Sequence, residues 1–153
     1  GLCHAMSGRR GLFRPDVISS SVGADKHGVK LSPTVPFNDM QDENAMEFYP
    51  NVIEKLNERN FAYLHIGFEK TPSTEMNWHR FLRPLFKGVY FANGGFTKTT
   101  GERLLADGIA DAIVYGKLFL ANPDLPKRVK LDAKLNEWDT TTFDSPGENG
   151  DTR

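Results

Sequence analysis

The chain has 153 residues, enough for one domain with a buried core, and 39% of them are hydrophobic while 25% are charged. The formal net charge of −1 predicts no broad basic surface, which argues against non-specific nucleic-acid binding. The single cysteine, Cys3, excludes an internal disulfide, and no apolar run approaches the roughly 20 residues that a transmembrane helix needs. We therefore expect a soluble, cytoplasmic protein with no nucleic-acid or membrane partner.

Hydrophobic periodicity predicts strands that alternate with helices along the chain. In chain order these are a helix over 13–22, a strand over 27–32, a helix over 43–59, a strand over 61–67, a helix over 74–85, a strand over 87–92, a helix over about 97–109 and a strand over 111–116. Pro50 should kink the second helix or move its start to Pro50. One of Thr97, Thr99 and Thr100 should cap the fourth helix.

The ends of the chain carry weaker patterns. We expect residues 1–12 to be irregular or derived from cloning, and 144–153 to be a disordered tail. Between them, the domain spans 13–143. Within it, Leu118–Leu120 continues past the last strand, and a short helix follows from about 122 to 129.

Four strands that alternate with helices predict an α/β fold with parallel pairing and right-handed crossovers. A full (β/α)8 TIM barrel needs about 250 residues, so four β/α units make half of one. Four strands are too few to close a barrel. The chain is therefore expected to form an open sheet, or a half-barrel that is completed by self-association.

Two glycine-containing turns follow predicted strands. Gly94 and Gly95 follow the third, and Gly116 and Lys117 end the fourth. Both turns should lie at the carboxyl edge of the sheet, where backbone N–H groups and a lysine can hold a phosphate. The alternative is that the glycines only form turns, as most Gly-Gly pairs do.

Several segments together resemble one known family, in its motif order and spacing. They are GADKHGVKLSP (23–33), LNERNFAYLH (56–65), FLRPLFKG (81–88), ANGGFT (92–97), GIADAIVYGKLFLANPDLPKR (108–128) and LNEWDTTTF (135–143). The chain resembles the carboxyl-terminal half of Old Yellow Enzyme-type flavin oxidoreductases. That family folds as a (β/α)8 barrel, binds FMN at the carboxyl ends of the strands, takes hydride from NAD(P)H and reduces activated alkenes or nitro esters.

The resemblance assigns binding roles to six residues of this sequence. Lys30 corresponds to the basic residue at the flavin's pyrimidine edge, and Phe37 to a loop aromatic near the substrate. The phosphate-binding positions correspond to Gly94, Gly95, Gly116 and Lys117. Lys30 and Lys117 replace the usual arginines, which keeps the charge and loses the bidentate fork.

Other positions depart from the family pattern. Phe143-Asp144 replaces an aromatic pair and lacks its tyrosine, and Gly67 to Lys70 replaces a Glu-Pro-Arg segment. The first four strands, with the substrate-binding histidine pair or His/Asn pair and the proton-donating tyrosine, have no counterpart in the sequence. We therefore assign no catalytic residue.

The histidines suggest no further chemistry. His65 ends a predicted strand and is expected to be a packed core residue. No metal site is expected, because no ligand spacing relates Cys3 to His4, His27 or His79.

Two interpretations remain open. The chain is either a flavin-binding half-barrel that pairs with a second copy or a complementing chain, with little or no activity by itself, or a non-catalytic, self-associating structural protein.

Overall fold

The computed structural model describes residues 2–4, 23–33, 45–67 and 75–138. The chain divides into two compact units, residues 1–114 and 115–153, and each is described by itself. Within the described parts of the chain, no helix is long and apolar enough to cross a membrane. The expected helix over 13–22 lies outside the described residues.

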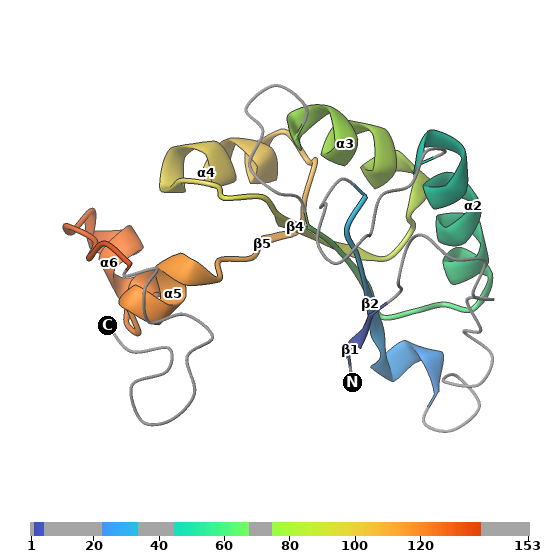
Figure 1. Cartoon of the computed structure of the whole chain (residues 1–153), viewed down its shortest axis with the longest axis horizontal. Coiled ribbons are helices and arrows are strands. Elements are labelled where there is room, and N and C mark those ends of the chain that lie inside the picture. Colours follow the sequence, from blue (N-terminus) through green and yellow to red (C-terminus); the bar gives the residue numbers. More distant parts are fainter. Residues whose placement is uncertain (1, 5–22, 34–44, 68–74, 139–153) are drawn as a thin grey trace. The chain divides into compact units, whose positions relative to one another are not determined.

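The first unit is organised on a parallel sheet whose strand order follows the sequence (Figure 1). Its strands are β1 (Leu2–His4), β2 (Gly28–Leu31), β3 (Tyr63–Gly67), β4 (Val89–Asn93) and β5 (Ala112–Ile113). All four pairs of neighbouring strands are parallel. The predicted parallel α/β arrangement is therefore confirmed.

The two edge strands differ from the prediction. Residues 2–4 were expected to be irregular, but they pair with β2, with Leu2 opposite Gly28. This pairing depends on the open edge of β2, which the local sequence does not encode. The last strand, β5, is shorter than the predicted 111–116. One further backbone hydrogen bond to β4 flanks it at each end: Asp111 N–H donates to Tyr90 C=O at 2.9 Å, and Val114 N–H donates to Ala92 C=O at 2.8 Å.

Helices line one side of this sheet in Figure 1. They are α2 (Ala45–Glu58), α3 (Glu75–Leu82) and α4 (Lys98–Ala106), with single 3₁₀ turns η1 (Ala24–Lys26) and η2 (Arg83–Leu85). Of the two expected effects of Pro50, a later start of α2 did not occur, because Pro50 lies inside the helix. The proline removes only the hydrogen bond to the Met46 carbonyl near the helix start, while the buried side chains of Ile53 and Leu56 hold the helix to the core.

The core lies between the helices and one face of the sheet. The strands contribute alternate residues that are at most 1% exposed: Val29, Leu31, Leu64, Ile66, Tyr90 and Ala92. The helices contribute Ile53, Leu56, Leu82 and Leu104, each also at most 1% exposed. Alternation with period two is the signature of strands that bury one face.

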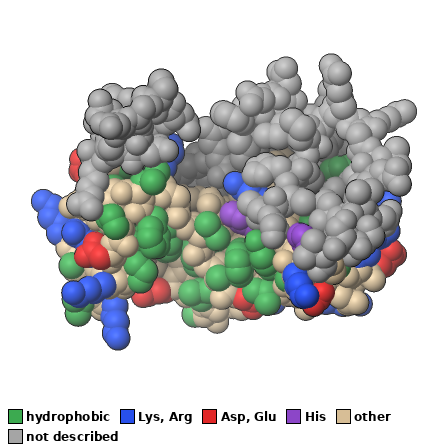
Figure 2. Space-filling view, turned by 90° about the horizontal axis from the view of Figure 1, so that it is seen from below, with side chains coloured by type: hydrophobic (Ala, Val, Ile, Leu, Met, Phe, Trp, Pro, Cys, Tyr) green, Lys and Arg blue, Asp and Glu red, His purple; other side chains and the backbone are tan. Residues whose placement is uncertain are grey.

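The opposite face of the sheet carries the intervening residues. Paired residues in a parallel ladder point to the same side, so Lys30, His65 and Phe91 form one row on this face. The Tyr63 ring covers Gly28 and stacks on Phe91 at 4.7 Å between ring centroids. Viewed from below, the molecule shows hydrophobic side chains gathered in the middle of its surface (Figure 2).

The second unit begins with two short helices, α5 (Lys117–Ala121) and α6 (Leu125–Leu131). The predicted helix over 122–129 corresponds to α6. Leu118–Leu120, which follows the last predicted strand and had no predicted element of its own, lies in α5. Residues 133–138 follow α6 without regular secondary structure.

Candidate functional site

Lys30 lies on the face of the sheet opposite the helices and is half-buried. Its pairing partner on β3 is His65, two residues before Gly67. A Cβ atom at Gly67 would lie 3.6 Å from both Lys30 Cε and Ser32 Oγ. The Lys30 side chain therefore extends toward the carboxyl end of β3 and carries its charge to that edge of the sheet.

The Gly94–Gly95 turn lies at the same edge, directly after β4. Gly94 is buried and Gly95 is exposed, and Gly95 has φ +68°, a left-handed conformation that favours glycine. Phe96 then buries its ring, and Thr97 begins the cap of α4. The turn thus joins the end of a strand to the start of a helix, where the first backbone N–H groups lack partners within the helix.

The cap of α4 is a reciprocal capping box. Thr97 Oγ1 accepts a hydrogen bond from Thr100 N–H at 3.3 Å, and Thr97 N–H donates to Thr100 Oγ1 at 2.9 Å. The structure thereby selects Thr97 from the three threonines that the sequence offered. Because both bonds are local, they fix the direction in which the chain leaves the glycine turn.

A buried histidine lies beneath this turn. His79 on α3 is 0% exposed, and its Nδ1 lies 3.0 Å from the Tyr90 hydroxyl oxygen. Its ring centroid is 5.5 Å from that of Phe96, with the rings tilted by 46°. From the sequence, His79 was weighed only as a metal ligand, and its place beneath the turn was not predicted. The signal was its spacing of three residues from Leu82, which places both side chains on one helix face.

Burial controls the ionisation of this pair. Desolvation lowers the pKa of His79 to about 4, an effect that the Asn93 backbone opposes and His65 reinforces. Burial also raises the pKa of Tyr90 well above its usual range, against the influence of Arg83. Both side chains are therefore neutral at physiological pH.

Arg83 and Asp111 fix the start of β4. Asp111 Oδ2 accepts a hydrogen bond from Tyr90 N–H at 2.7 Å and lies 3.1 Å from Arg83 Nη2. The Arg83 guanidinium also lies 5.8 Å from the centroid of the Tyr90 ring. This cluster anchors the strand that leads to the glycine turn.

The other two predicted phosphate residues, Gly116 and Lys117, belong to the second unit and are exposed where α5 begins. A Cβ atom at Gly116 would meet nothing within 4 Å, so the space beside this backbone is open. The structure brings Lys30, Gly94 and Gly95 to one edge of the first unit. Phe37 lies outside the described residues.

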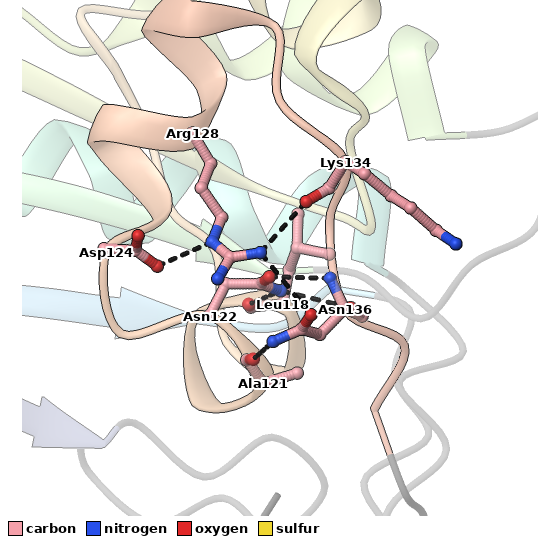
Figure 3. Close-up of polar contacts among 7 residues, drawn as sticks. All are labelled: Leu118, Ala121, Asn122, Asp124, Arg128, Lys134 and Asn136. Atoms are coloured by element: carbon pink, nitrogen blue, oxygen red, sulfur yellow. Dashed lines mark hydrogen bonds and ion pairs between the residues drawn. The ribbon is translucent and has the colours of Figure 1, made fainter.

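Two asparagines hold the end of α5 in place (Figure 3). Asn122 is 0% exposed, and its Nδ2 donates to the carbonyl oxygens of Leu118 at 2.9 Å and Asn136 at 3.1 Å. Asn136 in turn donates from its backbone N–H to Asn122 Oδ1 at 2.7 Å, and from Nδ2 to the Ala121 carbonyl at 3.0 Å. These bonds satisfy carbonyls that a helix end leaves open.

Arg128 extends the same network to α6. Its Nε lies 2.7 Å from Asp124 Oδ1, and its Nη1 donates to the Lys134 carbonyl at 3.0 Å (Figure 3). The pKa of Asp124 is lowered, mainly by its hydrogen bond from Arg128. The motifs at 121–128 and 135–136 are thus brought together in space, which explains why the resemblance includes both.

Comparison with known proteins gives relatives of one kind. No family model matches the chain. The chain is 39% identical over 134 residues to 12-oxophytodienoate reductase 1 of Oryza sativa subsp. japonica, which covers 84% of this chain and 35% of the relative. It is 36% identical over 133 residues to 12-oxophytodienoate reductase 2 of Arabidopsis thaliana, and this match covers 84% of this chain and 36% of the relative.

Solved structures agree with these relatives. Morphinone reductase matches with a TM-score of 0.79 at 29% identity, over 88% of this chain and 37% of that protein. The old yellow enzyme from Trypanosoma cruzi matches with a TM-score of 0.72 at 27% identity, over 78% of this chain and 32% of that protein. The α/β fold described above is therefore part of the TIM-barrel fold of these enzymes.

The chain spans about a third of the length of the relatives and structures that it matches. Within that span, the sequence identity and the fold agree. Over about a third of their length, the chain is therefore similar in sequence and fold to reductases of the Old Yellow Enzyme family.

Proposed function

We propose that this chain is an FMN-binding segment of an NAD(P)H-dependent oxidoreductase that reduces activated alkenes such as enones, or nitro esters. The reductases among its relatives support this assignment, because 12-oxophytodienoate and morphinone reductases are named for such substrates. The single observation that carries it is the Gly94–Gly95 turn, with positive φ at Gly95, at the edge toward which Lys30 extends.

These residues suit the chemistry of a flavin nucleotide. The glycine turn lets a phosphate approach the backbone closely, and its position before α4 favours negative charge. Lys30 supplies a cation on the face of the sheet opposite the helices, where it would stabilise negative charge at the pyrimidine edge of a reduced flavin. Bound FMN would supply hydride transfer. The resemblance alone assigns Lys117 a charge-assisted contact with the phosphate and Phe37 a contact with the substrate.

Substrate activation depends on residues outside these motifs. The resemblance assigns the pair that polarises the substrate oxygen, and the tyrosine that protonates carbon, to strands preceding this segment. Loss of one oxyanion donor costs about 10²–10³ in rate, and loss of a general acid about 10²–10⁴. We therefore expect a polypeptide of these 153 residues to reduce cyclohexenone with NADPH no faster than free FMN does.

The face of the sheet opposite the described helices suggests a partner. Tyr63 and Phe91 are only half-buried there, Val89 is 45% exposed, and β1 and β5 are the edges of the described sheet. Apolar faces and open edges favour association. We propose that a second copy or a complementing half-barrel covers this face. The same observation favours the second candidate function, a self-associating structural protein without flavin.

A flavin titration distinguishes the two candidates. The 153-residue polypeptide is titrated with FMN, and binding is followed by flavin fluorescence and visible absorption. Lys30→Met should weaken FMN binding by about tenfold and lower the reduction potential of the bound flavin, because a stabilising cation is lost. Lys26→Met is the matched control: Lys26 is exposed in η1, before the amino end of β2.

The outcomes separate the alternatives. FMN binding that depends on Lys30 and is unaffected by Lys26→Met supports the flavin assignment. No binding, together with sedimentation as a dimer, favours the structural alternative. A compact monomer at tens of micromolar, the range in which weak interfaces populate, would contradict a second copy as the partner.

A further inference from the structure

His79 is a fully buried titratable residue to which the proposed function gives no role. It lies on α3, between the strand that carries Tyr90 and the turn that follows that strand. A neutral imidazole offers one hydrogen-bond donor and one acceptor, and burying it without partners would be costly. Its surroundings therefore indicate what it does.

The contacts of His79 extend from the strand to the turn. Nδ1 lies 3.0 Å from the hydroxyl oxygen of Tyr90, within β4. The ring also interacts with the backbone of Asn93, the last residue of β4. The Phe96 ring, in the turn, lies 5.5 Å from the His79 ring, measured between centroids. His79 thus touches the residues on both sides of the Gly94–Gly95 pair.

A glycine pair has no side chains with which to hold its own conformation. Glycine loses more conformational freedom on ordering than any other residue, so an ordered Gly-Gly turn needs its flanking residues fixed. Asn93 and Phe96 are those flanking residues, and His79 interacts with both. The capping box of Thr97 fixes only the chain beyond them.

We infer that His79 is a positioning residue, which holds the Gly94–Gly95 turn in the conformation that receives a phosphate group. This inference rests on the proposed function for the nature of the ligand. The ordering of the turn by His79 does not depend on it. His79 does not touch the ligand, and acts through Asn93 and Phe96.

The test compares FMN with riboflavin, which lacks the phosphate, as probes of the 153-residue chain. His79→Leu removes the polar contacts with little change in volume. It should lower the ratio of FMN affinity to riboflavin affinity by about tenfold, because phosphate contacts weaken when their donors move. Tyr90→Phe, which keeps the ring and is the milder change, should lower this ratio by about threefold.

A second readout follows the turn without any ligand. Backbone ¹⁵N order parameters of Gly94 and Gly95 should fall in His79→Leu from about 0.85 toward 0.6, the range of flexible backbone. Leu56→Ala is the control: Leu56 is 0% exposed on α2, so this variant is destabilised without a change at the turn. It should leave both the affinity ratio and the order parameters unchanged.

The outcomes keep the two proposals apart. If the wild-type chain binds FMN no more tightly than riboflavin, the phosphate assignment fails, and the order parameters alone decide the role of His79. If His79→Leu leaves the order parameters and the affinity ratio unchanged, His79 is not a positioning residue. An equal effect of Leu56→Ala would show only general destabilisation and would overturn the inference as well.

Discussion

Burial of His79 should couple the stability of the first unit to pH. Its pKa falls from 6.5 to about 4 in the folded chain, chiefly because the ring is removed from water. The unfolded chain binds a proton near pH 6.5, whereas the folded chain resists protonation until about pH 4. The neutral histidine therefore contributes stability above pH 6.5, and this contribution is lost as the pH falls toward 4.

The magnitude follows from the difference between the two pKa values. At about 1.4 kcal/mol per pH unit, a fall from 6.5 to about 4 corresponds to about 3 kcal/mol of unfolding free energy. Below pH 4 both states are protonated and this contribution stays constant. Since small domains are stable by about 5–15 kcal/mol, a loss of this size should be readily measured.

The assay is urea unfolding of the wild-type chain and His79→Leu at pH 7, 6, 5 and 4. Fluorescence of Trp78, whose ring lies 6.2 Å from that of Tyr49 and 6.0 Å from that of Phe81, reports on packing around α3. The wild-type chain should lose about 3 kcal/mol relative to His79→Leu between pH 7 and 4. Leu56→Ala, which keeps His79, should parallel the wild type at a lower stability. A constant difference between wild type and His79→Leu across this range would refute the reasoning.

Three further variants test other parts of the structure. Gly28→Ala should lower the free energy of unfolding by about 1–3 kcal/mol, because the added Cβ would overlap the Tyr63 ring. This loss should nearly vanish in a Tyr63→Ala background, and equal losses in both backgrounds would contradict the contact. Asn136→Ala should destabilise the second unit by about 1–2 kcal/mol in urea unfolding, because the Ala121 carbonyl loses its donor; an unchanged midpoint would show that the network contributes nothing. Lys117→Ala should weaken FMN binding by about 1.5–3 kcal/mol, and an unchanged dissociation constant would place the phosphate elsewhere.

Much of the fold could be predicted because it is encoded locally. The parallel strands β2, β3 and β4 were found within one or two residues of their ends, since short β-rich runs between turn residues form a local pattern. Turn chemistry likewise predicted the glycine turn after β4 and a threonine cap for α4, although the structure had to select Thr97 from three candidates. The family motifs likewise predicted the kinship that the relatives show.

The tertiary structure decided what depends on distant partners. β1 forms because β2 offers an open edge, and α2 continues through Pro50 because its buried face supports it. The Asn122–Asn136 contact joins residues 14 positions apart, and no local pattern predicts it. His79 is the clearest example, because the residues around it in the sequence predict only a helix. Only folding buries the ring, which lowers its pKa to about 4, and only folding brings it against the Tyr90 hydroxyl and the Phe96 ring beneath the glycine turn.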